Sequence, residues 1–393
     1  MSGVAKAVER LVTAATSGAK DAALRAAVND VLESFDASNT KDVKAALGAL
    51  EGGMAKAEGR AAQVLNLALG ALVEGGASAD LAWPAASRGL EGALHDATRF
   101  ARACVEKSKK PVVAEAIAAA GAAVAKKDPR AADAWLSLPS RCLSAIACLT
   151  RSKKLREAEH ASGALSEAVY ALEDAVEEAG FLSQALRILD GTVVLLHPES
   201  GRAFRLAVTE LSSNIELYVL GVDALIAAGK LEGARPDPRA VKVLLDPEHL
   251  PKKPPTVVTS FHLSPWPGLE ELWLDASPYD LPLYADPPKA GRVKTNAGDR
   301  VVTLEDSDHA HVVVVEPSFP ALRPKVELAG ELPKAQASKI FAALTAARES
   351  VVKKPKKAAA KKDKKAAKKA EPKKSAAKKS SAKKKPAAKA KKA

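Results

Sequence analysis

The sequence has few of the residues that hold together a small secreted protein. Only three cysteines occur among 393 residues, namely Cys104, Cys142 and Cys148, and no CxxC motif is present. So few thiols exclude a disulfide framework and favour a reducing cytoplasm. The opening stretch MSGVAKAVERLV contains Glu9 and no long apolar run, so we expect no secretory signal peptide.

Long hydrophobic runs are also missing. The longest, at 112–125, is interrupted by Glu115 and is shorter than the roughly 18–20 apolar residues that a membrane-spanning helix needs. We therefore expect no insertion into a membrane.

The common catalytic signatures are absent from the sequence. We find no G-x-S-x-G, no P-loop, no G-x-G-x-x-G after a strand and no H-E-x-x-H. Metal-capable side chains gather once, in EDSDHAH, with Asp306, Asp308, His309 and His311. No further ligand follows at a recognisable spacing, so we interpret this stretch as a hairpin loop. The sequence thus predicts no catalytic residue, no metal and no cofactor, and an enzyme remains the third hypothesis for its function.

Residues 1–188 are rich in alanine, with Leu and Val recurring every three or four positions, which predicts five to eight packed helices. Asp128-Pro129 is typical of a helix start, and glycine pairs at 52–53 and 75–76 suggest breaks. The clearest helix is expected at 153–179, ending at Gly180, with an acidic group near its C-terminal end.

From residue 189 the apolar residues no longer recur at helical spacing but alternate as in a strand. Residues 189–232 are therefore predicted to form a β-hairpin followed by a helix that Ser213 and Glu216 cap. Prolines at 233–255 predict a linker. A small mixed α/β domain is expected at 256–350, with strands at 256–261, 300–304 and 311–315, a helix at 333–350, and a core that includes four aromatic residues, Trp266, Trp273, Tyr279 and Tyr284.

The expected fold class is therefore mainly α with a smaller α+β portion: an Ala-rich helical bundle, a short-stranded mixed domain and a disordered basic tail at 351–393. The stretch 187–290 resembles segments of uncharacterised proteins of high-GC bacteria. That resemblance implies a bacterial cytosol and no particular activity.

The positive charge is concentrated at one end of the chain. Residues 353–393 hold 20 of the 60 Lys and Arg residues but two of the 47 acidic residues, which gives this segment +18 and leaves −5 for the rest of a chain whose total is +13. Beyond Val352 there is no Leu, Ile, Val or aromatic residue, so nothing there can offset the entropy of ordering. The candidate nucleic-acid-binding residues are its lysines, Lys353, Lys354, Lys356, Lys357, Lys361, Lys362, Lys364, Lys365, Lys368, Lys369, Lys373, Lys374, Lys378, Lys379, Lys383, Lys384, Lys385, Lys389, Lys391 and Lys392.

Paired lysines spaced by alanines, with prolines at 355, 372 and 386, resemble the C-terminal tails of linker histones and the Lys/Ala/Pro-rich extensions of some bacterial nucleoid-associated proteins. The resemblance implies polyanion binding, but not nucleosome recognition, because residues 1–352 show no winged-helix domain. Independently of it, each lysine that neutralises a phosphate releases a condensed counterion. The tail has no Arg, Asn or Gln to read base edges and no aromatic residue to stack on bases.

The first hypothesis is therefore sequence-independent DNA binding by a cytoplasmic, nucleoid-associated accessory protein. RNA, another polyanion or an anionic membrane surface satisfies the same chemistry. The alternative is a protein-interaction scaffold, whose helical body binds a partner while the tail only localises or solubilises it. Two basic clusters in the body, at 107–110 and 151–156, are interpreted as ordinary helix ends.

Overall fold

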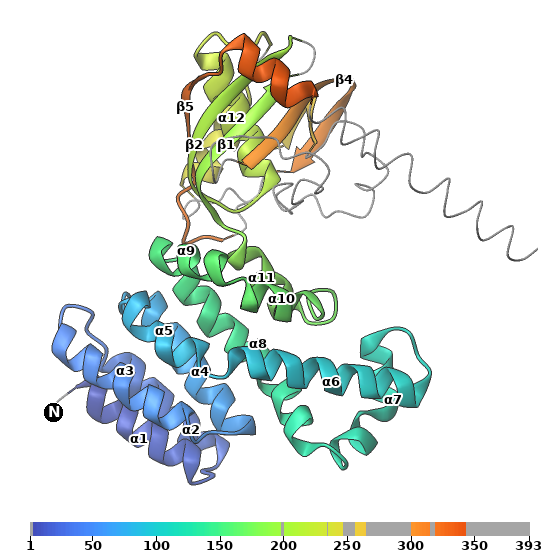
Figure 1. The fold of residues 1–393 in the computed structure, drawn as a ribbon. Helices are drawn as coiled ribbons and strands as arrows, with labels where there is room; N and C mark the ends of the chain where they lie inside the picture. Colours follow the sequence, from blue (N-terminus) through green and yellow to red (C-terminus); the bar gives the residue numbers. More distant parts are fainter. Residues whose placement is uncertain are drawn as a thin grey trace, which may run out of the picture.

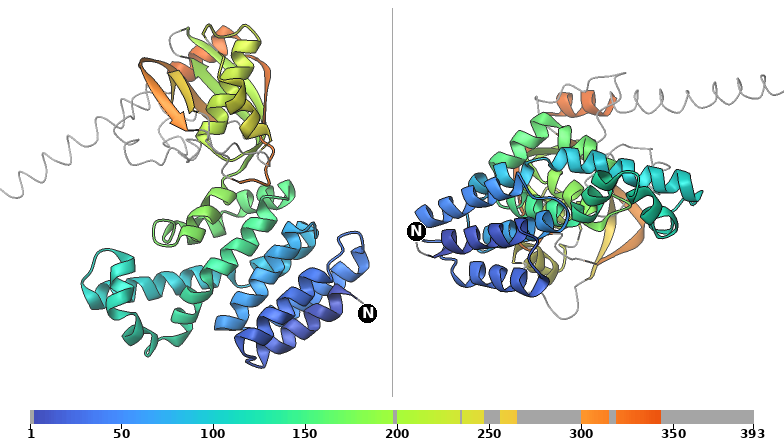
Figure 2. Two further views of the ribbon diagram at one scale, coloured as in Figure 1. Left: turned by 180° about the vertical axis from the view of Figure 1, so that it is seen from behind. Right: turned by 90° about the horizontal axis from the view of Figure 1, so that it is seen from below.

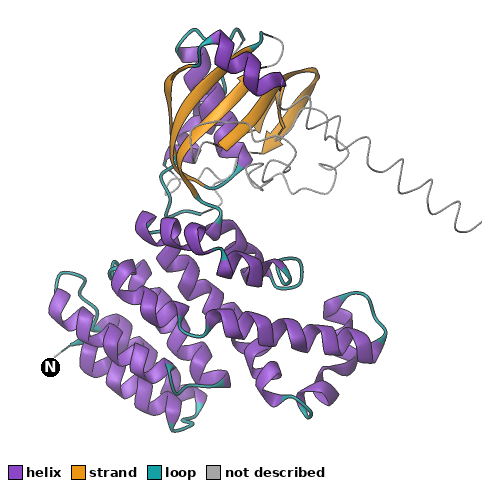
Figure 3. Ribbon diagram, viewed as in Figure 1, coloured by secondary structure: helices purple, strands orange, loops and turns teal. Residues whose placement is uncertain are grey.

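The computed structural model describes residues 3–197, 200–233, 235–246, 256–264, 300–314 and 319–342 of the chain, the two stretches 256–264 and 300–314 by their backbone alone (Figure 1). The described part is mainly helical, with one β-sheet at one end of a helical body, as expected from the sequence (Figure 3). The predicted tail at 351–393 lies outside the described residues.

The helical body consists of consecutive helices joined by short turns. Their bounds are α1 Val4–Thr16, α2 Asp21–Glu33, α3 Thr40–Met54, α4 Gly59–Glu74, α5 Ala79–Ser87, α6 Leu90–Ser108, α7 Val113–Ala125, α8 Pro129–Leu149, α9 Lys153–Ser162, α10 Ala164–Tyr170 and α11 Glu177–Leu186. This series contains more helices than the five to eight that the sequence suggests.

Helix α8 is the central element of the body. Asp128 caps it by accepting a hydrogen bond from the Ala131 amide at 3.1 Å, and Pro129 occupies the first turn, as predicted. It packs against α4, α5, α6 and α11. Its small buried residues, among them Ala145 and Cys142, allow these helices to approach closely.

The predicted helix at 153–179 is wrong, because the chain breaks twice within it. Gly163 adopts a left-handed conformation with φ of 71°, which ends α9 and begins α10, and a turn separates α10 from α11. Leu165, Val169 and Leu172 are nevertheless buried, so the apolar stripe marked the core correctly. Leu165 and Val169 lie on α10, and Leu172 lies in the turn that follows it.

The interpretation of the acidic group also changes. Glu177 and Glu178 lie in the first turn of α11 instead of at a helix C-terminus, so their charge favours the helix dipole. Gly180, the expected stop, lies inside α11.

The glycine pair at 52–53 does not break a helix either, because both residues lie in α3. A Cβ on Gly53 would come within 2.7 Å of the Val12 side chain, so this glycine allows α3 to pack closely on α1.

A five-stranded sheet follows the helical body. Its strands are β1 Leu189–His197, β2 Arg202–Leu211, β3 Thr256–Ser264, β4 Arg300–Val314 and β5 Lys325–Glu331, in the spatial order β3-β4-β1-β2-β5. The predicted hairpin is present, with Leu195 paired to Phe204, and β5 lies antiparallel to β2. Strand β1 is parallel to β4, and β4 is antiparallel to β3.

Helices cover both faces of this sheet (Figure 2). Val193 and Leu195 pack with α12 (Asn214–Ala227) and α13 (Pro238–Leu245), while Val194 and Leu196 pack against a helix at 334–342. Successive side chains of a strand point to opposite faces, which explains the unbroken apolar run of β1. The predicted capping box at the start of α12 is present.

The expected boundaries at 233 and 256 do not separate structural units. The hairpin and the strands of 256–350 form a single sheet, and α13 lies within the predicted linker. A hairpin with one helix leaves one sheet face bare, so it needs the later elements to cover it. Phe319 and Leu322, which the sequence places in the mixed domain, are buried in the helical core.

Candidate functional site

The predicted nucleic-acid-binding lysines, Lys353 to Lys392, lie outside the described residues. The structure describes the element that precedes them, the helix at 334–342. Ala337 and Ile340 bury this helix against Val194, Leu196 and Ala203 of the sheet. Lys334 and Lys339 are on its exposed side. The chain therefore leaves the described structure from a helix that is fixed on the sheet.

The basic cluster at 151–156 does not form one exposed surface. Arg156 is 1% exposed and its guanidinium contacts Asp190. The ammonium groups of the two lysines in this stretch each approach a carboxylate, with Lys153 3.7 Å from Glu157 and Lys154 3.9 Å from Asp80. Arg151 follows the end of α8, and Lys153 and Lys154 begin α9, so these three lie at helix ends as interpreted. Arg156 does not, because it is a buried residue within α9.

The second cluster lies at the C-terminal end of α6. Lys109 ends that helix in a left-handed conformation with φ of 61°, and Lys110 lies 3.8 Å from Glu115. Lys107 is exposed in the last turn of the helix, where a cation is favourable. Only Lys107 and Lys109 of this cluster point to solvent without an ion pair within the described residues.

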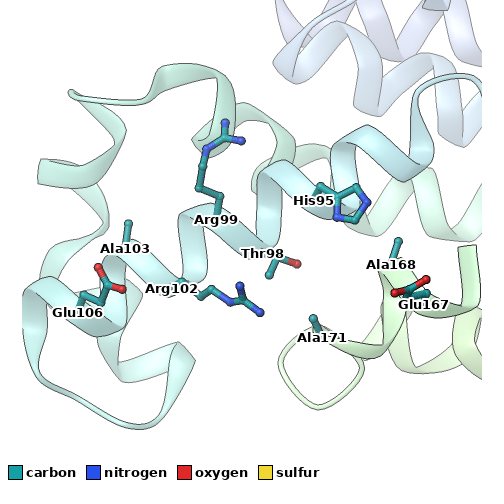
Figure 4. Close-up of a pocket in the computed structure, with 9 residues that line it drawn as sticks. All are labelled: His95, Thr98, Arg99, Arg102, Ala103, Glu106, Glu167, Ala168 and Ala171. Carbon is teal, nitrogen blue, oxygen red and sulfur yellow. The ribbon is translucent and has the colours of Figure 1, made fainter. Parts of the chain in front are cut away.

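A groove of about 490 Å³ lies along α6, facing α10 and the turn after it (Figure 4). Three basic side chains from successive turns of α6 line it, namely His95, Arg99 and Arg102. Their i, i+4 and i+7 spacing places them on one helix face. These three residues were not predicted as functional, although their spacing is visible in the sequence.

The charges of this groove are mixed. Arg99 donates to Asp96 at 2.6 Å and to Asp128 at 2.9 Å, and these carboxylates raise the pKa of Arg99. Glu106 and Glu167 also line the groove. Arg102 is exposed and makes no ion pair with any described residue. The groove offers a single uncompensated guanidinium, which suits an auxiliary contact with an anion more than a catalytic centre.

The joint between the helical body and the sheet contains a buried ion pair. Arg156 of α9 donates through Nε to Asp190 of β1 at 2.8 Å, and its Nη1 donates to the Leu149 carbonyl at 2.9 Å. Asp190 also accepts from the amide of Glu210, whose backbone is left-handed with φ of 54°. The Glu210 carboxylate in turn accepts from the amide of Arg323 at 2.8 Å.

This network connects α9, both hairpin strands and the segment before β5, so it fixes the sheet on the body. This network could not be predicted from the sequence, because Arg156 and Asp190 are 34 residues apart.

The cysteines and the possible metal ligands were the remaining candidates for chemical reactivity. Burial raises the pKa of Cys142 and of Cys148 to about 12, which keeps both thiols protonated at neutral pH, and Cys104 is buried as well. All three cysteines are thus buried residues of the helical body. Within the described residues no three His, Cys, Asp or Glu side chains gather as a metal site would require.

The stretch 306–311, expected as a hairpin loop, lies within β4 instead. Its pairing with β3 is irregular at this point, since Phe261 is opposite Asp306 and Thr259 is opposite His311. A bulge of this kind interrupts the hydrogen bonds between the two strands, but the segment remains part of the β-strand. The four aromatic residues expected in the core of the mixed domain lie at 265–299, outside the described residues.

Comparison with known proteins finds no matching family model, no matching curated protein and no matching solved structure. In the part of the chain that the structure describes, no helix has the length and apolar character needed to cross a membrane.

Proposed function

We propose that this protein binds nucleic acid without sequence preference through the lysines of residues 353–393. The observation that carries the proposal is their charge, +18 in 41 residues with two acidic residues among them. Neutralising phosphates with such a segment releases counterions, which is a large favourable term in dilute salt. Duplex DNA is the preferred target, because the tail has no aromatic side chain to stack on unpaired bases.

The proposal includes a cytoplasmic, nucleoid-associated location and a tail similar in role to those of linker histones. Its support from the folded part is indirect. The lysine segment follows a helix that is packed on the sheet, while Arg156 at the joint and Arg202 on the sheet are each engaged in an ion pair. The tail would thus attach the folded part to the duplex.

The test is a mobility-shift titration of the full chain against two duplexes of equal length and different sequence. Both duplexes should bind equally, and replacing the twenty tail lysines by Gln should abolish the shift. The matched control replaces Lys107, Lys109 and Lys110 by Gln, which should leave the affinity almost unchanged. Binding that survives the tail substitutions, or that differs more than tenfold between the duplexes, would overturn the proposal.

A second candidate function is that of a protein-interaction scaffold, and an exposed apolar strip on the helical body favours it. Leu136 and Leu143 of α8 are 60% and 42% exposed and lie seven residues apart on one helix face. Leu143 and Phe181 line a mostly apolar groove of about 310 Å³ with Pro320. Large apolar side chains that gather on a surface are typical of interaction sites.

This candidate predicts that a partner is retained after nuclease digestion. The Leu136→Ser/Leu143→Ser variant should lose that partner, while the variant with Gln in place of the tail lysines should keep it. If the two variants behave in the opposite way, the retained molecule is bound by the tail and the scaffold function is rejected.

A further inference from the structure

A second cavity, of about 570 Å³, lies between α4, α6 and α8 on the helical body. Its size is within the range of small-molecule sites in proteins. Polar side chains from α8 line one wall, including Asp133, Ser137 and Arg141, and small residues of α6 line the opposite side.

Arg141 is the unusual residue of this cavity. It is partly buried, and its Nε donates to the Ser137 hydroxyl at 3.3 Å. It makes no ion pair with any described residue, and desolvation lowers the pKa of its guanidinium. A guanidinium carries five N–H donors in a planar fork, so most of its donors are left for a ligand or for water.

The other charges of the cavity are arranged differently. Asp96 accepts hydrogen bonds from Arg99 at 2.6 Å and from Arg130 at 2.8 Å, so its charge is compensated. Asp133 has no ion-pair partner among the described residues and lies eight residues before Arg141 on α8. Eight residues correspond to a rise of about 12 Å along the helix. The wall thus has an acceptor end at Asp133 and a donor end at Arg141.

Glycines keep the facing wall open. A Cβ added to Gly89 or to Gly92 would meet no atom within 4 Å, so space, and not a neighbouring side chain, lies in front of both residues. Gly92 is inside α6, where a side chain would suit the helix better than glycine does. The cavity therefore exists in part because Gly92 has no side chain at a position that would accept one.

We infer that this cavity binds a small bipolar molecule, with a carboxylate or phosphate on Arg141 and an ammonium or hydroxyl group toward Asp133. The shared chemistry is the oxyanion at one end and hydrogen-bond donors at the other. The inference does not depend on the proposed function, because it is argued from residues of the helical body alone.

The test is isothermal titration calorimetry of the full chain with two bipolar probes, 6-aminohexanoate and glucose 6-phosphate. Acetate and inorganic phosphate serve as the corresponding simple anions. At least one bipolar probe should bind with a Kd below about 1 mM, at one molecule per chain, and more tightly than its simple anion. Preference for 6-aminohexanoate identifies a carboxylate ligand, and preference for glucose 6-phosphate identifies a phosphate ligand.

Three variants locate the binding. Arg141→Met should weaken it at least tenfold, because a charge-assisted pair is lost, and Asp133→Asn should remove the preference for bipolar probes. Gly92→Leu should block the cavity while the helix stays folded. The matched control is Gly52→Leu on α3, where a Cβ also meets no atom within 4 Å, and it should bind as the wild type does.

Phosphate binding that persists in Arg141→Met and disappears when the tail lysines are replaced would assign the signal to the tail and overturn the inference. Failure of both bipolar probes to bind the wild-type chain would overturn it as well.

Discussion

The cations of the folded part and those of the tail differ in kind and in surroundings. In the described residues, arginines commonly have a carboxylate partner, as in Arg60–Asp21, Arg235–Asp223 and Arg202–Glu331. The tail has twenty lysines, two acidic residues and no arginine. Arginine's planar fork suits directed pairing, whereas lysine is a point charge on a flexible stem. Arginines of the body are thus commonly engaged in local pairs, whereas the tail has twenty lysines and two acidic residues, an excess that the proposed polyanion binding would use.

The largest expected effect concerns the tail, whose lysines divide into two equal halves. Ten lie at 353–369 and ten at 373–392. If charge alone matters, replacing either half by Gln should weaken binding to duplex DNA by the same factor, on the order of 10³ at physiological salt. Mobility-shift titrations of the two variants check this. A loss of DNA affinity in only one of the two variants would indicate a specific binding motif. Charge alone would then not account for binding by the tail.

In the body, the buried pair at the joint should have a large effect on folding and none on binding. Arg156 and Asp190 have side chains that are 1% and 2% exposed. Arg156→Met leaves the Asp190 carboxylate buried without its partner, which should lower the free energy of unfolding by about 3–5 kcal/mol. Urea denaturation measures this loss.

The control for this prediction is the double variant Arg156→Met/Asp190→Leu, which leaves no unpaired charge and should regain much of the lost stability. Both variants should bind DNA as the wild type does whenever they are folded. A stability loss below 1 kcal/mol in Arg156→Met would mean that the joint does not depend on this pair.

Glu216 provides a contrast to the buried pair of Arg156 and Asp190, because it is a buried carboxyl group without a cation beside it. Its carboxylate accepts from the amide and hydroxyl of Ser212 and from the amide of Ser213, yet desolvation dominates and raises its pKa to about 7. The ordinary pKa in the unfolded chain is 4.5. The folded state therefore binds the proton more tightly than the unfolded state does.

This contribution to stability is fully present below about pH 4.5 and is lost as the pH rises toward 7 and above it. The expected loss is about 3 kcal/mol between pH 4.5 and pH 8. Denaturation curves across this range should be flatter for Glu216→Gln than for the wild type. Equal slopes in the two proteins would show that the group is not titrating there.

The smallest effect is expected at an exposed pair on the sheet. Arg202 donates to both carboxylate oxygens of Glu331, at 2.8 and 2.7 Å, and this lowers the pKa of Glu331 to about 2. The contribution is present above pH 4.5 and is lost as the pH falls toward 2. Because solvent screens the pair, Glu331→Gln should cost less than about 1 kcal/mol at neutral pH, measured by urea denaturation. A larger loss would mean that this exposed pair contributes to stability as the buried pair of Arg156 and Asp190 does.

Local signals in the sequence predicted local structure well. The hairpin of β1 and β2, the capping box at Ser213 and the start of α8 at Asp128 were recognisable, because each depends on residues close together in the chain. The break after Tyr170 was missed because Leu165, Val169 and Leu172 keep the apolar spacing of one helix face, although Leu172 lies in the turn after α10.

Features made by distant residues could not be predicted in this way. The sheet joins β1 to β4 more than a hundred residues later, and the cavity at Arg141 requires α4, α6 and α8 to come together. Neither depends on a pattern within one window of sequence. The candidate lysines were found from composition alone, which identifies the chemistry of a charged segment without its conformation.

The most direct test of the central claim is the salt dependence of DNA affinity for the full chain and for a chain that ends at Val352. If about ten tail lysines engage phosphates, the full chain should give a slope of log K against log salt near −9, and the shortened chain should show no measurable binding. Equal affinity and equal slope for the two chains would contradict the account, because the folded body would then be the part that binds nucleic acid.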